Sequence, residues 1–164
     1  MILRKIQPQD NEQIAKVIRD IFDELNAPKE GTAYADPILD QLYEVYQQPK
    51  SIYFIVEHEG EVLGGGGLAP LEMLNQVQHD KDSICELQKM YFAPQVRGLG
   101  LGKEIIEKSL EFAKNQGFTK CYLETLPYMQ NARKLYEKMG FQYLDGPMGC
   151  TGHTSCDVWM IKEL

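Results

Sequence analysis

A glycine-rich junction between a strand and a helix constrains the fold of this chain more than any other feature. Residues 84–92 have the composition of a strand, which Pro94 ends, and the apolar spacing over 100–116 predicts a helix. Glycines at such a corner allow a tight turn, and the start of a helix adds unpaired backbone donors, which suits a phosphate or pyrophosphate. Arg97 and Lys103 would supply positive charge nearby. The junction reads Arg97-Gly98-Leu99-Gly100-Leu101-Gly102-Lys103.

The spacing of these glycines leaves two interpretations open. It is G-x-G-x-G, whereas the dinucleotide-binding fingerprint is G-x-G-x-x-G. It is not a Walker loop either, because Lys103 is followed by Glu104 where that loop has Ser or Thr. Glycines at a strand–helix corner also often serve only the turn. From spacing alone, phosphate binding and a structural turn are about equally supported.

Hydrophobic patterns and turn residues divide the chain into strands and helices. Asp10 and Gln13 have the spacing of a helix-capping box, Asp36-Pro37 resembles the start of a second helix, and Glu59-Gly60 indicates a hairpin. The expected strands are 2–6, 51–57, 61–68, 84–92, 120–125, 141–144 and 157–161. The expected helices are 10–25, 36–46, 100–116 and 128–139, and residues 70–83 are expected to form a surface loop.

This order, β-α-α-β-β-β-α-β-α-β-β, predicts an α/β fold. We expect a mixed central sheet of about seven strands with helices on both faces, in a single domain over residues 1–164. Four consecutive glycines, 64–67, lie in the strand that follows the hairpin. They predict either a close approach of backbone in the sheet or a simple kink.

Composition excludes several classes of protein. The formal net charge of −7 argues against nucleic acid as a partner, since its phosphates are bound through Lys and Arg. No apolar run approaches the roughly 20 residues that a membrane span needs, and the N-terminus lacks the pattern of a secretory signal. Four cysteines are too few for a disulfide scaffold, so we expect free thiols and a cytoplasmic location.

Two motifs in this topology resemble the GNAT superfamily of acetyltransferases. The superfamily signature at the strand–helix corner is [QR]-x-x-G-x-[GA], and Arg97 to Gly102 fits it. Gln95 to Gly100 fits as well, but the first register places Ile105 and Ile106 at the apolar helix positions of the family. The segment Leu135-Tyr136-Glu137-Lys138-Met139-Gly140-Phe141 is similar to the LYEKxGF end of the family's fourth helix. The element order matches over nearly the whole chain.

The resemblance implies acetyl-CoA as co-substrate and no metal. The backbones of Met90, Tyr91 and Phe92 would pair with the pantetheine arm like an extra strand, in a gap where this strand splays from the next one. Backbone amides from Gly98 to Lys103 would hold the pyrophosphate.

The resemblance also implies catalytic groups. Tyr136 would be the hydroxyl that protonates the departing thiolate, although a tyrosine on an amphipathic helix is also commonly a core residue. Two glutamates are candidates for the base that deprotonates the amine. Glu86 begins the strand that carries the pantetheine contacts, and Glu124 lies at the end of the next strand. A carboxylate in a semi-buried cleft can have its pKa raised toward neutrality, and we favour Glu86.

One position departs from the family pattern. The family often has an Asn seven residues before the tyrosine of the fourth helix, where it contacts the cofactor, and this chain has Met129 there. Asn131 is two residues further on, about 200° around a helix. It should therefore not simply inherit the contact.

The acceptor site is expected between two segments that are far apart in the sequence. In the GNAT fold the turn before the last strand borders this site, so His153 is a candidate for substrate contact or an auxiliary base. Its alternative is a solvent-exposed loop histidine. The opposite wall is expected from Tyr34, Asp36 and Tyr43.

Cysteines flank that histidine in the pattern C-x-x-H-x-x-C, formed by Cys150, His153 and Cys156. These are zinc-type ligands, but the spacing is not a standard one and a fourth ligand is missing. We therefore expect no metal site here.

The function that the resemblance implies is transfer of an acetyl group to the amine of a small molecule, such as an amino acid, an amino-acid derivative or a polyamine. The alternatives are acetylation of a protein N-terminus or lysine, and an acetyl-CoA-binding module without catalysis. A protein acceptor would need an open groove. Many relatives dimerise, so a homodimer is also an option.

Overall fold

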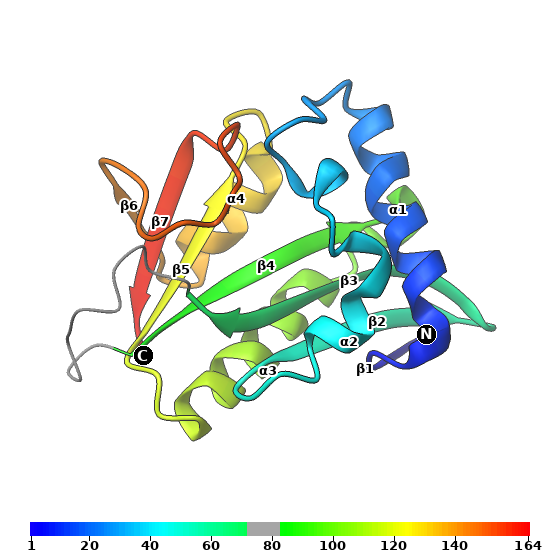
Figure 1. The fold of residues 1–164 in the computed structure, drawn as a ribbon, viewed down its shortest axis with the longest axis horizontal. Helices are drawn as coiled ribbons and strands as arrows, with labels where there is room; N and C mark the ends of the chain where they lie inside the picture. The colour runs from blue at the N-terminus through cyan, green and yellow to red at the C-terminus, as the bar shows by residue number, and fades with distance from the viewer. Residues whose placement is uncertain (72–82) are drawn as a thin grey trace.

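A seven-stranded sheet forms the centre of the computed structural model, which describes residues 1–71 and 83–164 (Figure 1). The strand order is β1-β2-β3-β4-β5-β7-β6, and β4 and β5 are the parallel pair in an otherwise antiparallel sheet. This confirms the predicted mixed sheet. The strands are β1 (Ile2–Lys5), β2 (Ile52–His58), β3 (Glu61–Pro70), β4 (Ile84–Phe92), β5 (Lys120–Thr125), β6 (Gln142–Leu144) and β7 (Val158–Glu163).

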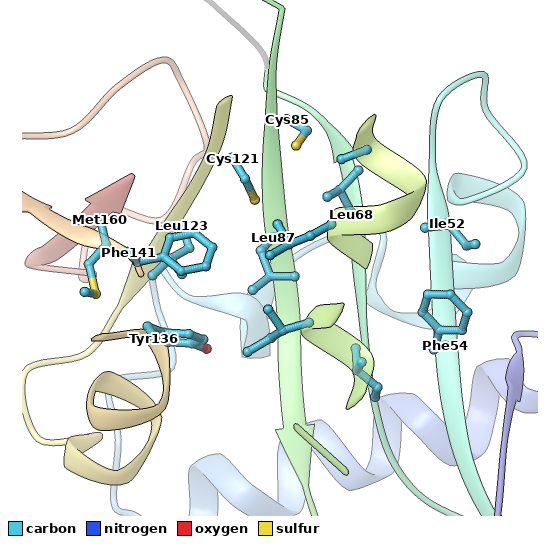
Figure 2. Packing of buried hydrophobic residues seen from close by; sticks show 14 of the residues in the cluster. Ile52, Phe54, Leu68, Cys85, Leu87, Cys121, Leu123, Tyr136, Phe141 and Met160 are labelled. Atoms are coloured by element: carbon cyan, nitrogen blue, oxygen red, sulfur yellow. The ribbon is translucent and has the colours of Figure 1, made fainter. Parts of the chain in front are cut away.

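Helices cover both faces of this sheet, as predicted. The helices are α1 (Asn11–Glu24) and α2 (Leu42–Val45) on one face, and α3 (Leu101–Asn115) and α4 (Gln130–Lys138) on the other (Figure 1). Each face has its own buried core. Phe22 and Leu42 belong to the core under α1 and α2, and Ile105 and Tyr136 to the core under α3 and α4. Figure 2 shows the second core, in which Tyr136 lies close to Phe141.

Of the predicted helix over 36–46, only the C-terminal part is an α-helix, and the predicted start at Asp36 is wrong. Asp36 has an extended backbone, a short 3₁₀ turn follows at Leu39–Gln41, and α2 has only four residues. Tertiary contacts outweigh the capping signal here. The Asp36 carboxylate forms an ion pair with Lys89 of the sheet, while Leu39 and Leu42 are both fully buried. These contacts hold the segment in short turns that follow the sheet surface.

The four glycines of β3 allow close packing, as one of the two interpretations predicted. A Cβ on Gly65 would lie 2.7 Å from the ring of Tyr53, and a Cβ on Gly66 would lie 2.0 Å from the sulfur of Met90. Both distances are far below a normal contact between carbon and a neighbouring heavy atom. The sheet therefore has no room for larger residues at this place.

The remaining boundaries differ from the predicted ones by one or two residues, which is the usual scatter. Most of the loop predicted over 70–83 lies outside the described residues, since these omit 72–82. The Glu59-Gly60 hairpin is confirmed, and both residues have positive φ, 52° and 85°. In the described part of the chain, no helix combines the length and the apolar character that crossing a bilayer requires.

Candidate active site

The two parallel strands at the centre of the sheet separate part of the way along. β4 pairs with β5 from Ile84 to Leu87, opposite Lys120 to Leu123, and their pairing ends there although β4 continues to Phe92. Figure 1 shows the two strands diverging beyond this point. Within the described residues, the edge of β4 after Leu87 therefore faces a gap where β5 would otherwise pair. Such an edge offers backbone N–H and C=O groups to an extended ligand.

A bulge in β4 lies at the start of this gap. The register between β3 and β4 shifts between Gly65 and Gly67, and Lys89 has a φ of +52°, which is uncommon for a residue with a side chain. The buried hydroxyl of Tyr53 donates a hydrogen bond of 2.9 Å to the Lys89 carbonyl. Because of the bulge, Lys89 points to the same face of the sheet as its neighbour Gln88.

A cavity of about 600 Å³ lies beside the gap, and we call it the junction cavity. Every residue predicted to bind the cofactor lines this cavity except Leu99, which is 59% exposed. Met129 and Asn131 both line the cavity, so the departure from the family pattern leaves a polar side chain nearby. The lining is Met90, Tyr91 and Phe92 from β4, Arg97, Gly98 and Gly100–Lys103 from the junction, residues 128–132, Leu135, Tyr136 and Lys138 around α4, and Ile21, Leu25 and Val96.

The glycine junction has the backbone geometry of an anion site. Gly98 and Gly100 have φ of +78° and +82°, and α3 begins at Leu101 with no side chain capping its N-terminus. The first N–H groups of a helix have no partner within the helix and carry positive partial charge. At the mouth of the junction cavity, these donors are available to a pyrophosphate.

The two basic side chains of the junction are already paired. The Arg97 guanidinium contacts both carboxylate oxygens of Glu24 at 2.8 Å and donates to the Phe92 carbonyl at 2.8 Å. Lys103 lies 3.4 Å from Glu107. Arg97 thus ties the junction to α1 and β4, and the countercharge predicted from these two residues is partly neutralised.

Tyr136 lines the junction cavity from α4. It is 6% exposed, and burial raises the pKa of its hydroxyl above the ordinary value of 10. The hydroxyl therefore keeps its proton at neutral pH. It makes no hydrogen bond to another described residue, and Figure 2 shows it pointing from α4 toward β4.

Five charged residues from four segments meet on the opposite face of the gap, and we call them the charged cluster. Lys89 Nζ lies 2.7 Å from Asp36 Oδ2, and His153 Nε2 lies 3.8 Å from the same oxygen. His153 Nδ1 is 4.0 Å from Glu124 Oε2, and one atom each of Glu86, Glu124 and His153 lie within 4.8 Å of one another. The cluster consists of Asp36, Glu86, Lys89, Glu124 and His153, and none of them lines the junction cavity.

The two glutamates of the cluster accept hydrogen bonds from neutral groups. Glu124 accepts from the hydroxyls of Tyr122 and Thr151, both at 2.7 Å. Glu86 accepts a hydrogen bond of 2.6 Å from the side-chain amide of Gln88. The buried Tyr46, which follows α2, orients this amide by donating its hydroxyl to the amide oxygen of Gln88. Among the described residues, neither carboxylate forms an ion pair with a lysine or arginine, although the charge of Lys89 acts on Glu86.

Burial gives the cluster an uneven distribution of protons. Burial raises the pKa of Glu86 from the ordinary 4.5 to about 7. The hydrogen bond from Gln88 and the charges of His153 and Lys89 oppose this effect, and the charge of Glu124 adds to it. Burial also works to raise the pKa of Asp36, but the contacts with His153 and Lys89 outweigh it and hold that pKa well below its usual range. Near neutral pH, Asp36 is ionised and Glu86 exchanges a proton readily.

Two segments meet over the charged cluster, and we call them the covering segments, residues 26–36 and 145–157. Ser155 donates its backbone N–H to the Gly31 carbonyl at 3.0 Å and its hydroxyl to the Glu30 carbonyl at 2.9 Å. A Cβ on Gly31 would lie 2.3 Å from the Thr154 hydroxyl. The segments are therefore in direct contact, and the cluster beneath them is nearly covered.

The predicted site residues thus divide into two groups. The structure brings Asp36, Glu86, Glu124 and His153 together. Tyr34 instead packs on Phe22, with 6.1 Å between ring centroids and Lys29 over its ring. Tyr43 is bound through its backbone to the Asn11 side chain.

Sequence reasoning missed several polar residues of this site, among them Gln88, Lys89, Tyr122 and Thr151. Tyr122 and Gln88 lie two positions from Glu124 and Glu86 on the same strands, so the period-2 alternation of a strand places them on the same face. That alternation was available from the sequence. The inward orientation of the Lys89 side chain follows from the bulge in β4, and no local sequence pattern indicated that bulge.

The groups closest to a metal-ligand arrangement among the described residues are Glu86, Glu124 and His153, not the cysteine pattern. Cys150 is exposed, and burial raises the pKa of the Cys156 thiol to about 12. A thiol with that pKa stays protonated at neutral pH, whereas metals bind the thiolate.

Comparisons with known proteins identify the family and the fold of this chain. A family model described as the acetyltransferase (GNAT) family matches residues 17–141. The uncharacterized N-acetyltransferase YjgM of Escherichia coli strain K12 is 48% identical over 99% of this chain and 95% of its own length. A GNAT-family acetyltransferase from Staphylococcus aureus Mu50 has the same fold, with a TM-score of 0.84 at 20% identity over 99% of this chain and 98% of its own. An aminoglycoside 6′-N-acetyltransferase complexed with coenzyme A superimposes with a TM-score of 0.67 at 17% identity, over 99% and 97%.

Proposed function

The chain belongs to the GNAT family and is an N-acetyltransferase, and we propose that it moves an acetyl group from acetyl-CoA to the primary amine of a small molecule. One observation carries the proposal. The gap between β4 and β5 has the junction cavity with Tyr136 on one side and the charged cluster with Glu86 on the other. A thioester in this gap would lie between a proton donor and a proton acceptor.

The donor side is suited to acetyl-CoA. The unpaired edge of β4 from Gln88 to Phe92 can pair with the amides of the pantetheine arm, and the N-terminus of α3 with Gly98 and Gly100 can hold the pyrophosphate. The cavity volume of about 600 Å³ falls in the usual range for a ligand site. These contacts come from backbone, so Leu99 can contribute to them while its side chain is exposed.

On the acceptor side, Glu86 is the proposed base. An acceptor ammonium must lose a proton before its nitrogen attacks the acetyl carbonyl, and a carboxylate with a pKa of about 7 can take that proton at neutral pH. Glu124, held by Tyr122 and Thr151, is proposed to bind the ammonium and orient it. This leaves the two candidate glutamates with different roles.

The reaction then proceeds by direct attack. The amine nitrogen forms a bond to the carbonyl carbon, the C–S bond breaks, and the departing thiolate takes a proton from the Tyr136 hydroxyl. The ammonium gives its first proton to Glu86 before the attack, and Glu86 passes it to water. The second nitrogen proton leaves as the amide forms and returns to the Tyr136 phenolate through water, so that one proton is released overall. A thiol pKa of about 8.5 makes the thiolate a fair leaving group, so Tyr136 assists the step rather than controlling it.

The covering segments support a small acceptor over a protein one. An extended peptide needs an open groove, whereas the hydrogen bond from Ser155 to Gly31 joins the two covering segments. A small amine needs only a local separation of these two segments. His153 and Asp36, which lie one on each segment, would then border the entering amine.

The test is release of free thiol from acetyl-CoA in the presence of amino acids, polyamines, amino sugars and short peptides, with mass spectrometry of the products. We expect acetylation of at least one small amine and no turnover with peptides. Turnover with peptides alone would favour a protein acceptor. Acetyl-CoA binding measured by calorimetry, without turnover on any amine, would contradict the proposal and leave a binding module.

A further inference from the structure

The charged cluster contains an unusual cation. Lys89 is the one lysine or arginine that is buried among the described residues, with a side chain only 3% exposed. Its position follows from the β4 bulge and the Tyr53 hydrogen bond to its carbonyl, so the backbone holds it there. Its ammonium lies 2.7 Å from Asp36 Oδ2, and the Asp36 side chain is 15% exposed. A buried pair of this kind is costly to break, because either partner alone would leave an uncompensated buried charge.

This pairing determines which charges remain for a substrate. Lys89 forms its ion pair with Asp36. Among the described residues, the hydrogen bonds to the carboxylates of Glu86 and Glu124 come from the neutral side chains of Gln88, Tyr122 and Thr151. His153 is shared between Asp36 and Glu124, at 3.8 and 4.0 Å. In the described residues, the cluster therefore offers carboxylates to an ammonium, but the one permanent cation near them is already bound.

We propose that the Lys89–Asp36 ion pair makes the acceptor site a charge filter, which accepts amines without an adjacent carboxylate and rejects free amino acids. The inference rests on the proposed function and narrows its substrate class. A carboxylate beside the reacting amine would approach Glu86 and Glu124 at short range in a poorly solvated site, which is strongly unfavourable. Among the described residues, Lys89 is the one permanent cation of the cluster that could compensate this carboxylate. To reach it, the carboxylate would have to displace Asp36, which would then keep only His153 beside it.

Matched sets of acceptors test the filter on the unaltered protein. Each set contains an amine, its α-carboxylated analogue and the amide of that analogue, and each acceptor has a single primary amine: tyramine, tyrosine and tyrosinamide; histamine, histidine and histidinamide. The amide has nearly the size of the acid without its charge. In the set that the enzyme accepts best, we expect kcat/KM for the amine and the amide to exceed that for the acid by about 100-fold or more.

Each outcome of this experiment separates the hypotheses. Equal use of acid and amide would overturn the filter and leave the proposed function intact. Rejection of both acid and amide would assign the selectivity to size and overturn the filter as well. Absence of turnover with every acceptor, while acetyl-CoA still binds, would contradict the proposed function itself.

Substitution of Asp36 tests the mechanism of the filter. Asp36→Asn leaves Lys89 without its carboxylate and available to a substrate carboxylate, so the ratio of amide to acid should fall by about tenfold or more. The double variant Lys89→Met/Asp36→Asn has neither charge, and the ratio should stay above that of Asp36→Asn. An unchanged ratio in Asp36→Asn would overturn the assignment of the filter to this pair. Because both substrates are measured on one sample, a partly folded variant reports the same ratio.

Discussion

The two sides of the β4–β5 gap differ in the kind of group that forms them, backbone groups on one side and side chains on the other. The junction cavity uses mainly backbone groups of one continuous stretch, from Met90 to Lys103, together with α4. The charged cluster uses side chains from four segments, which are joined only in the folded chain. A site of backbone groups follows from local sequence, whereas a site of scattered side chains depends on the whole fold.

This difference predicts which kinetic constants respond to substitution. Changes in the charged cluster should affect kcat and the choice of acceptor, because its groups contact the amine and its proton. Changes at the glycine junction should affect acetyl-CoA affinity and leave the choice of acceptor alone. A substitution that changes both sides equally would contradict this division.

The largest effect is expected at Glu86. Glu86→Gln keeps an oxygen that can accept the hydrogen bond from Gln88 but removes the base. We expect kcat to fall by about 100-fold or more, with the dissociation constant of acetyl-CoA nearly unchanged. Steady-state kinetics and calorimetry measure the two quantities. A loss of acetyl-CoA affinity equal to the loss of kcat would refute the separation of the two sides.

The pH profile provides the control for this variant. Since Glu86 has a pKa of about 7, the wild-type rate should rise as pH increases through 7 and then level, and Glu86→Gln should lose this step. The folded state binds more protons than the unfolded state between 4.5 and 7, because burial raises this pKa, so stability declines as pH rises through that window. Glu86→Gln should therefore be at least as stable as wild type at pH 8, and denaturant unfolding would detect a folding defect.

A smaller effect on turnover is expected at Tyr136. Tyr136→Phe removes the hydroxyl that points into the junction cavity but keeps the ring packed near Phe141. Because the thiolate is a fair leaving group without assistance, kcat should fall by about tenfold with acetyl-CoA binding nearly unchanged. Tyr143→Phe removes an exposed hydroxyl elsewhere and serves as the control. An unaffected rate in Tyr136→Phe would exclude its role as proton donor.

The contrast between the two sides also explains what the sequence could predict. The junction and its helix follow from a contiguous pattern, and the structure places all the predicted junction residues except Leu99 at the cavity. The order of strands and helices is confirmed as well, because each amphipathic segment has a periodicity that depends on its own residues. The catalytic roles of Glu86, Glu124 and Tyr136 stay predictions.

Predictions failed where distant contacts decide the local structure. Asp36 has a capping sequence, yet its ion pair with Lys89 and the burial of Leu39 hold the chain in turns instead of a helix. Lys89 itself lies in a strand, where a lysine usually faces solvent. Only the bulge opposite Gly66 turns it inward, and a bulge depends on two strands at once.

On the cavity side, a moderate effect is expected from Gly100. Its φ of +82° disfavours any side chain, although a Cβ would meet no atom within 4 Å. Gly100→Ala should therefore strain the junction and weaken acetyl-CoA binding by about 3- to 10-fold, at a stability cost of about 1 kcal/mol. Gly117→Ala is a matched control at the other end of α3, since Gly117 has a φ of +83° and equally open space. It should lose similar stability without a change in acetyl-CoA affinity. Equal losses of affinity in both variants would indicate a general folding effect.

The smallest effect is expected from the ion pair that occupies Arg97. The Arg97 and Glu24 side chains are 40% and 41% exposed, so the pair contributes only about 0–1 kcal/mol to stability. Glu24→Gln would release the guanidinium toward the anion site of the junction, and acetyl-CoA should bind up to about 3-fold more tightly, less so at high salt.

Asp40→Asn is the control for this charge change, because it removes one negative charge from a similar exposed pair with Arg19. Calorimetry of acetyl-CoA binding at low and high salt distinguishes the two. Weaker binding in Glu24→Gln alone would mean that the pair acts by holding the junction against α1, and the countercharge predicted for Arg97 would then be wrong. Tighter binding would show that a side chain can add to a site that backbone groups form on their own.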